Sequence, residues 1–480
     1  MVYAHGYRTS TVIAALLATA ATGTLAADYQ VGDVVVATEM TELRAGDQVT
    51  DRVQRGFTFP ALAVRGKLLW VSRGFPGWLH AKHTIPLDDA VPQFTRAIRC
   101  DPSDALNYWA RGTVHQELRN PDAARADFEQ AARLDPAMAP AYNSLGSLWN
   151  DDGFYNRAID CYNQAVQLYD NQRRSGPFDP AREQAVALSN RGFCRLSSGA
   201  HREAADDFDA AIRQEPKLSH AYVGRGWCHA ASWQWEEALG AFDEAIRLDP
   251  KLASAYHGRG QAKAGANDHR AALSDFGTAT ELYRRQLQTI GTARDRRSCR
   301  ERLAFVLVSR ALTHADVGQC NQAFADFEQA LSVDPGCESA YLSRAQVHRR
   351  RGQDQEALDC WQHAIRIYMG RIAERPTPRV RRALAEVLTE RGAFHGWRER
   401  KAARADYTEA IRTDPQYAQA FHQRSLLSIG EERYAEALAD SQQAITLLPG
   451  WASAHRVRDW LTRKLAETSV AGATGPNVPK

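Results

Sequence analysis

Histidines, arginines and aspartates recur at fixed positions along this chain and are its first candidates for chemistry. Five histidines share one position of a repeated unit: His115, His229, His314, His348 and His395. A metal ion needs several ligands within about 2 Å of one centre. These histidines lie in different copies of the unit, and no nearby His-x-x-x-His or Cys-x-x-Cys pair completes a set. The sequence therefore predicts no metal site.

A column of arginines is matched by a column of acids. Six copies of the unit hold both partners: Arg111 with Asp127, Arg191 with Asp207, Arg259 with Asp275, Arg310 with Asp326, Arg391 with Asp406, and Arg424 with Asp440. We predict ion pairs between the two helices of each repeat, worth about 0.2 to 1 kcal/mol each where exposed. The exceptions are Leu145, which faces Cys161, and Arg225 and Arg344, which face Ala241 and Cys360.

No catalytic arrangement emerges from the remaining residues. The chain holds no convincing set of nucleophile, base and orienting group, no Gly-rich phosphate loop and no His-Glu-x-x-His motif. The prediction is accordingly a protein that is not an enzyme and uses no cofactor.

Two columns of alanines indicate the elements that carry these residues. The later column is mostly spaced by 34 residues: Ala97, Ala131, Ala165, Ala211, Ala245, Ala279, Ala330, Ala364, Ala410 and Ala444. The earlier column, from Ala90 to Ala437, precedes it by seven residues, which is two helical turns. A large residue such as Phe128 stands between the two alanines, and most copies close with a proline that ends one helix and starts the next.

The other half of each unit carries a small residue within a predicted helix. These residues are Gly112, Gly146, Gly192, Gly226, Gly260, Ala311, Ala345, Gly392 and Ser425. A 34-residue helix-turn-helix with this pattern resembles the tetratricopeptide repeat. Nine full copies and one leading half are present, so the resemblance implies a mainly α fold, a right-handed α-solenoid over residues 87–449. The arginine column departs from the family pattern, which has leucine there.

The resemblance also implies a concave groove formed by the first helices. Its predicted lining is Trp109, Asn143, Phe193, Trp227, His257, Gln261, Gln346 and Arg349. Aromatic anchors among amides suit an extended peptide or a partner protein. The alternative is that Trp109 and Phe193 pack against a neighbouring turn of the superhelix. No lysine stands in the groove columns, which disfavours the chaperone tails that some family members bind through a terminal carboxylate.

Residues 28–86 follow a β-type pattern of short apolar runs between Gly and polar turns. Val31-Gly32-Asp33-Val34-Val35-Val36, Gly56 before Phe57, Leu69-Trp70-Val71 and Gly77-Trp78-Leu79 resemble the bacterial SH3-like barrel. That resemblance implies a cleft in which Trp70 and Trp78 hold a peptide, such as one from the cell wall. The alternative is that both tryptophans fill a small core. The barrel is expected to pack against the solenoid as a cap.

Three copies lack the closing Asp-Pro, near residues 169–185, 283–302 and 368–382. Without the proline stop the helices can continue, so longer hairpins are predicted there. Two of these insertions are rich in arginine, including Arg294 and Arg302 in one and Arg371 and Arg382 in the other. Either they bind an anionic partner or they form solvated helix faces. No aromatics interleave the arginines, which disfavours nucleic acid.

The first 27 residues read as an export signal, with an apolar run from Val12 to Ala21 and cleavage near Ala26 or Ala27. The run is shorter than the roughly 20 residues of a membrane span, so the mature chain is expected to lack one. The alternative is an uncleaved membrane anchor. In an exported protein, the eight cysteines either form disulfides or act as small buried hydrophobes.

Composition and the chain ends complete the prediction. With 480 residues, 24% of them charged, and a net charge of +3, the chain gives no global case for an anionic partner. A capping helix is expected over residues 450–467 and a disordered tail over 468–480. The predicted function is an exported scaffold, periplasmic or secreted, that binds a protein or peptide in its groove. The alternative is an envelope sensor that reads the cell wall through its β domain.

Overall fold

The computed structural model describes residues 33–473 except 40, 46–47, 54, 56–57, 62, 66–67, 73–75, 176–179 and 290–292. The predicted export signal, parts of the predicted hairpins near 169–185 and 283–302, and the last seven residues therefore lie outside the described residues. The chain divides into two compact units, the first ending at Pro335 and the second beginning at Gly336. Each unit is described by itself below.

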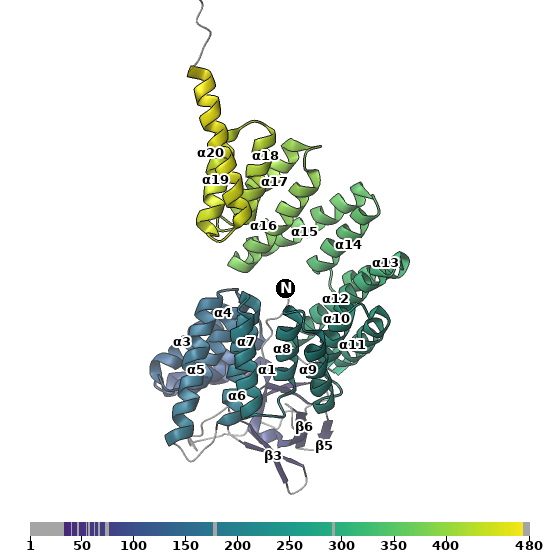
Figure 1. Cartoon of the computed structure of the whole chain (residues 1–480). Coiled ribbons are helices and arrows are strands. Elements are labelled where there is room, and N and C mark those ends of the chain that lie inside the picture. Colours follow the sequence, from purple (N-terminus) through teal and green to yellow (C-terminus); the bar gives the residue numbers. More distant parts are fainter. Residues whose placement is uncertain are drawn as a thin grey trace, which may run out of the picture. The chain divides into compact units, whose positions relative to one another are not determined.

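Short strands open the first unit and form two antiparallel sheets (Figure 1). The three-stranded sheet has the order β4-β1-β8 and consists of Thr58–Pro60, Val34–Ala37 and Thr84–Pro86. The five-stranded sheet has the order β3-β2-β7-β6-β5 and consists of Gln48–Val53, Thr41–Ala45, Pro76–His80, Leu68–Ser72 and Ala63–Arg65. Seven apolar residues form their shared core: Val35, Ala37, Leu43, Phe59, Leu69, Val71 and Leu79.

The two sheets do not reproduce the predicted barrel. Among the described residues no ring of strand pairings closes them into one structure, so a β-rich segment is present but an SH3-like barrel is not supported. Strands of three to six residues each make few ladder hydrogen bonds, and the sequence pattern carries little information on how they close.

The β segment packs against the first helices of the repeats. Alternation along β1 turns Val35 into the β core, whereas Val36 packs with Phe94 and Val114. Arg55 lies between the two parts, and its guanidinium donates to Asp104 Oδ2 at 3.2 Å and to Asn107 Oδ1 at 2.9 Å. The contact predicted for a cap is therefore present, although the cap is a pair of sheets.

Twenty helices follow in the described residues, most of them in antiparallel pairs (Figure 1). In the first unit, α1 (Leu87–Cys100) precedes α2 (Ala105–Glu117) with α3 (Pro121–Leu134), α4 (Ala139–Asp151) with α5 (Tyr155–Ser175), α6 (Ala181–Ser198) with α7 (His201–Gln214), α8 (Ser219–Ala231) with α9 (Trp235–Leu248), α10 (Ala253–Gly265) with α11 (His269–Thr289), and α12 (Ala293–Asp316) with α13 (Cys320–Val333). In the second unit the pairs are α14 (Glu338–Arg350) with α15 (Asp354–Glu374), α16 (Pro378–His395) with α17 (Arg400–Thr413), and α18 (Ala418–Gly430) with α19 (Tyr434–Leu447), followed by α20 (Ala452–Ala473).

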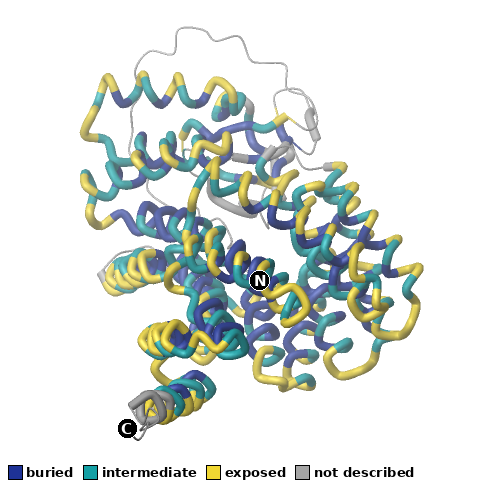
Figure 2. Tube along the Cα trace, turned by 90° about the horizontal axis from the view of Figure 1, so that it is seen from above, coloured by how far each residue is buried: buried dark blue, intermediate teal, exposed yellow. Residues whose placement is uncertain are grey.

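Small residues and rings hold each pair together. Both alanine columns are buried except for the half-buried Ala97, and the rings between them are buried too, including Phe128, Phe208 and Phe276. A Cβ atom added to Gly260 would lie 2.7 Å from the ring of Phe276, so only glycine fits that approach without a shift. Figure 2 shows buried residues where helices face one another and exposed residues at many of the turns.

The three places without Asp-Pro carry longer helices. α5, α11 and α15 are 21 residues long, whereas α3, α7 and α9 have 14. In the third place, Thr377 begins the next helix by accepting a hydrogen bond from the backbone N–H of Val380. At the C-terminal end, α20 runs to Ala473, so residues 468–473 are helical instead of disordered as predicted. Among the described residues, no helix has the length and apolarity needed to span a membrane.

Candidate functional site

The six predicted arginine–aspartate pairs are all formed. Each joins the first helix of a repeat to the second, with the shortest N–O distance between 2.5 and 2.8 Å. In five of the repeats, Nε and Nη2 each donate to a different carboxylate oxygen, as for Arg259 on Asp275 at 2.8 and 2.7 Å. The aspartates are buried, so these pairs are less screened by water than fully exposed pairs would be.

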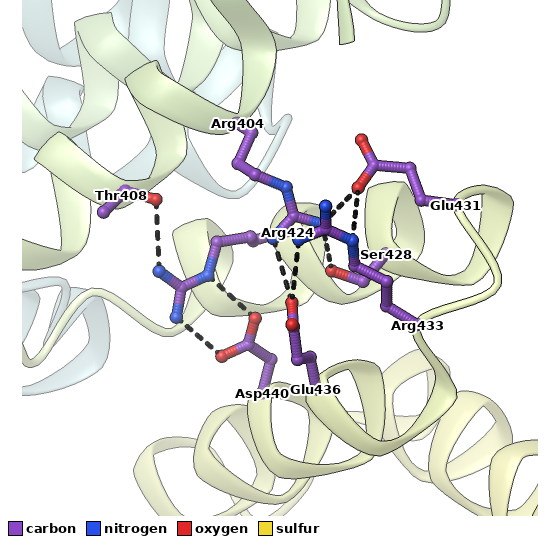
Figure 3. Close-up of polar contacts among 8 residues, drawn as sticks. All are labelled: Arg404, Thr408, Arg424, Ser428, Glu431, Arg433, Glu436 and Asp440. Carbon is purple, nitrogen blue, oxygen red and sulfur yellow. Dashed lines mark hydrogen bonds and ion pairs between the residues drawn. The ribbon is translucent and has the colours of Figure 1, made fainter. Parts of the chain in front are cut away.

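Five of these six arginines make a second contact that sequence reasoning missed. Nη1 of Arg259 donates to Asp243 Oδ1 at 2.7 Å, and Nη1 of Arg424 donates to Thr408 Oγ1 at 3.2 Å (Figure 3). The acceptor always follows the large ring of the preceding repeat, as do Thr95, Asn163 and Gln362 for Arg111, Arg191 and Arg391. Each of these arginines therefore ties together three helices from two neighbouring repeats.

Two repeats without the aspartate use other acceptors. Nε of Arg344 donates to the thiol sulfur of Cys360 at 3.3 Å. Arg225 lies opposite Ala241 and reaches Asp209 of the preceding repeat at 3.6 Å.

All eight cysteines lie in the described residues and none is in a disulfide. Burial raises the pKa of Cys194 and of Cys228 to about 12, in keeping with the reading of these cysteines as buried hydrophobes.

The histidine column belongs to the same network. His115, His314 and His395 lie 3.9 Å from the aspartates of their own repeats. Arg195 and Lys263 occupy the equivalent position and contact their aspartates at 2.7 and 2.8 Å. The column thus supplies a second cationic or imidazole neighbour for five of the six carboxylates. No group of three potential metal ligands occurs in the described residues.

An arginine on the second helix links some repeats further along the edge. Nη2 of Arg404 on α17 donates to Ser428 Oγ at 2.9 Å and to Glu431 Oε2 at 2.5 Å, and its Nη1 contacts Glu436 at 3.1 Å (Figure 3). Arg125 on α3 pairs with Asp152 in the same manner and lies over the ring of Trp149 at 4.3 Å. These contacts join α3 and α17 each to the repeat that follows.

The first helices of the first unit stand side by side and form one surface, here called the first-helix face. Trp109 on α2 donates from Nε1 to Ser144 Oγ on α4 at 3.2 Å. Asn190 on α6 donates to Asn143 Oδ1 on α4 at 3.2 Å. His257 on α10 and Ser309 on α12 are 3.0 Å apart. The predicted groove residues of this unit therefore lie on neighbouring helices.

The predicted aromatic anchors are mostly integrated into the packing. Trp109 and Trp227 are buried, and the ring of Trp227 meets Phe242 edge-on at 5.3 Å. Phe193 is half-buried, with its ring 4.8 Å from that of Phe208. Packing within and between repeats, the alternative that the sequence left open, thus accounts for most of their surface.

The cluster around His257 resembles the serine–histidine pair of a catalytic site, but its hydrogen bonds indicate a structural role. Ser309 Oγ donates to the carbonyl of Phe305 at 3.1 Å, so it accepts from His257 Nε2 and from Gln261 Nε2, both at 3.0 Å. Burial lowers the pKa of His257 to about 3 and keeps the ring neutral. A histidine that donates to the serine is in the wrong tautomer to take its proton.

In the second unit, the predicted groove residues lie on α14. Gln346 is half-buried and Arg349 is exposed. Burial raises the pKa of Glu390 on α16, and the positive charge of Arg349 opposes that rise. The predicted groove is therefore more polar and more accessible on this helix than on α2.

Three residues on the first helices of the first unit carry side-chain oxygens without a partner. Asn150 Oδ1, Ser189 Oγ and Asn190 Oδ1 have no hydrogen-bond partner in the described part of the chain, and the three residues are 4%, 2% and 2% exposed. Buried polar atoms are rarely left in this state, since each costs about 1–3 kcal/mol. They lie on adjacent helices, α4 and α6.

An arginine of the first basic insertion contacts earlier repeats of the same chain. Arg294, near the start of α12, has Nη1 3.5 Å from the carbonyl oxygen of Gln116 and Nη2 3.8 Å from Asp151 Oδ2. With its amide oxygen turned toward the guanidinium, Gln116 also accepts from Nη2 at 3.2 Å. Burial lowers the pKa of Arg294, and Asp151 opposes that change.

The second insertion is likewise engaged by neighbouring groups. Arg371 contacts Glu338 at 2.9 Å and donates to the carbonyl of Gly336 at 2.8 Å. Arg382 pairs with Asp414 at 2.5 Å and lies over the ring of Tyr417. These arginines stabilise the long hairpins, which favours a structural role over binding of an anionic partner.

In the β segment, Trp70 and Trp78 stand directly opposite each other on β6 and β7. The structure describes the backbone of these two residues but not their side chains. Their role as a peptide cleft therefore stays a prediction.

Comparison with known proteins covers parts of the chain. The tetratricopeptide repeat family matches residues 109–173 and 219–252, and the bacterial transcriptional activator domain matches residues 248–388. Superkiller complex protein 3 of Mus musculus is 30% identical over 160 residues, which are 27% of this chain and 10% of that protein. Small glutamine-rich tetratricopeptide repeat-containing protein 2 of Mycosarcoma maydis is 27% identical over 79 residues, 16% of this chain and 22% of that protein.

The chain spans less than a quarter of the length of either of these curated relatives. Among solved structures, yeast Tom70 superposes with a TM-score of 0.55 at 16% identity, covering 81% of this chain and 87% of that one. This likeness shows the fold. The prediction of a mainly α chain with tetratricopeptide repeats is confirmed.

Proposed function

We propose that this chain of tetratricopeptide repeats is a scaffold that holds an extended segment of a partner protein on the first-helix face of its first unit. The observation that carries the proposal is the set of unpartnered oxygens of Asn150, Ser189 and Asn190 on adjacent helices. These oxygens are almost wholly covered in the free chain, so an extended peptide, which brings backbone N–H groups at regular intervals, satisfies them when the side chains turn outward. Burial of the groups makes each hydrogen bond gained worth more than one in water.

The comparisons support the same class of function. One of the relatives is named as a component of a complex, and such repeats present long surfaces to other proteins. We further propose that the scaffold acts after export, in the periplasm or outside the cell, because residues 1–27 read as a signal. Fusion of residues 1–27 to a reporter that is active only outside the cytoplasm tests the export step.

Photo-crosslinking tests the binding face. A benzophenone amino acid at Phe193, half-buried on a first helix, should capture partner peptides that map to one continuous segment. The matched control is Phe324, also half-buried but on a second helix, α13. Equal capture from both positions, or none from Phe193, overturns the proposal.

A second arm asks whether the unpartnered oxygens matter. Asn150→Ala should weaken capture from Phe193, whereas Asn321→Ala at the exposed start of α13 should leave it unchanged. Thermal melting of both variants shows that the fold is retained. Unchanged capture with Asn150→Ala removes the observation on which the proposal stands.

A further inference from the structure

The C-terminal ends of α2 and α4 together form a cation-binding subsite. Each end carries the negative end of a helix dipole, and the last-turn carbonyl of Gln116 accepts from the backbone N–H of Arg119 at 3.2 Å as well as facing Arg294. The carbonyl and the amide oxygen of Gln116 come from α2, and the carboxylate of Asp151 comes from α4. Carboxylate and carbonyl oxygens at this spacing suit a guanidinium or an ammonium group.

A guanidinium from the same chain already occupies this subsite. Arg294 reaches it from α12, 178 residues along the chain from Gln116. Only 20% of its side chain is exposed, and its Nη2 lies 3.8 Å from Asp151 Oδ2. A contact this long leaves room for a closer one, so the site binds Arg294 without fully using its charge.

The neighbouring polar atoms favour a ligand rich in donors. Asn150 precedes Asp151 on α4, and its Oδ1 has no partner, as is true of Asn190 Oδ1 on α6. Amide oxygens only accept hydrogen bonds, so they match N–H groups and not carboxylates. An acidic segment would place its charge against Asp151.

We infer that the first-helix face selects a partner segment that carries arginine or lysine, whose cationic side chain takes the subsite that Arg294 fills in the free chain. The inference rests on the proposed function and specifies the chemistry of the partner. Arg294 is then an internal competitor, because the ligand gains the subsite only when this side chain withdraws. Removing Arg294 should strengthen binding of a cationic segment, and removing Asp151 should weaken it.

Fluorescence anisotropy with the full chain tests this inference. The probes are three fluorescein-labelled Gly-Ser peptides of equal length, identical except for two central residues, which are Arg, Gln or Glu. At low salt the Arg probe should bind about tenfold more tightly than the Glu probe. Arg294→Ala should raise the affinity for the Arg probe about threefold or more, and Asp151→Asn should lower it by a similar factor.

The matched control is Arg300→Ala, which removes an exposed arginine from the same helix. It should leave the preference for the Arg probe unchanged. Thermal melts check the folding of each variant. If Arg294→Ala is unfolded, Asp151→Asn still decides the matter because it leaves Arg294 in place.

Equal binding of the Arg and Glu probes overturns the inference, as does an Arg294→Ala variant that binds the Arg probe no better than the parent chain. Neither result affects the crosslinking from Phe193. A face that captures its partner there but shows no preference for cations keeps the proposed function and loses only this specificity.

Discussion

The guanidinium of Arg259 and the carboxylate of Asp275 share two hydrogen bonds, of 2.8 and 2.7 Å, between the two helices of one repeat. The third nitrogen of the same guanidinium donates to Asp243 in the repeat before. One side chain thus holds the two helices of its own repeat together and also holds this repeat against the preceding one. Because Asp275 is buried, losing its partner leaves a charge that water cannot easily reach.

Breaking this fork should destabilise the chain. Arg259→Leu leaves Asp275 with Lys263 as its remaining cation, and we expect the free energy of unfolding to fall by about 2 kcal/mol. The double variant Arg259→Leu with Asp275→Leu should lose less than the sum of the single changes. Urea unfolding followed by circular dichroism measures all three, and simple additivity would refute coupling between the residues.

Restoring a missing fork should stabilise the chain. Cys360 accepts from Arg344 where other repeats have aspartate, so Cys360→Asp should raise the free energy of unfolding by about 0.5–1 kcal/mol. Cys161→Asp is the matched control, because it faces Leu145 and should destabilise the chain instead. The same sign of change for both variants would contradict the explanation.

Two glycines of one repeat should respond in opposite ways to alanine. Gly260→Ala drives a methyl group to 2.7 Å from the ring of Phe276 and should cost about 1–3 kcal/mol. Gly277→Ala, within α11, meets no atom within 4 Å and should stabilise the helix by about 0.5–1 kcal/mol. Thermal denaturation of the two variants gives the comparison. A neutral Gly260→Ala would mean that the helices have room to separate.

Buried histidine should make the stability fall at acidic pH. The pKa of His257 is lowered to about 3 in the folded chain, against about 6.5 when unfolded. Between these values the unfolded chain binds a proton that the folded chain does not, so the free energy of unfolding decreases as pH falls, by at most about 1.4 kcal/mol per pH unit.

His257→Gln keeps a donor toward Ser309 and removes this titration. Urea unfolding at about pH 7 and about pH 5 should therefore show a smaller loss of stability in the variant than in the parent chain. An equal loss would mean that other groups, such as the half-buried His220, whose pKa is also lowered by burial, account for the acid sensitivity.

Much of the helical architecture was readable because its physical signals recur in each repeat. A proline after Ala330, for example, predicts the end of α13, and the structure ends that helix at Val333. The pairing of Arg259 with Asp275 was also readable, since the two residue types recur together at fixed positions in six copies of the unit. The contact with Asp243 was not, because Thr95 or Asn163 can serve equally well as acceptor.

Features formed once in the chain were harder to predict. The contact of Arg294 with Gln116 has no counterpart in another repeat and depends on how many layers stack between them. The β segment failed for a related reason, since strand closure depends on pairings between short runs that the sequence pattern does not specify. The groove residues lie on the expected helices, yet most of the surface of Trp109 and Trp227 is taken up by packing.

Most links in this chain reach only the adjoining layer, so a deformation at one repeat fades within the next, as in a coil spring. Arg294 is different, because it connects the sixth hairpin to the first and the second. This contact closes that part of the solenoid into a loop. Its release would remove this constraint from all the hairpins between the first and the sixth in a single step. Repeats could be duplicated elsewhere along the chain with little consequence. An extra copy inserted between Asp151 and Arg294 would instead move Arg294 away from Asp151 and Gln116 and abolish their contact.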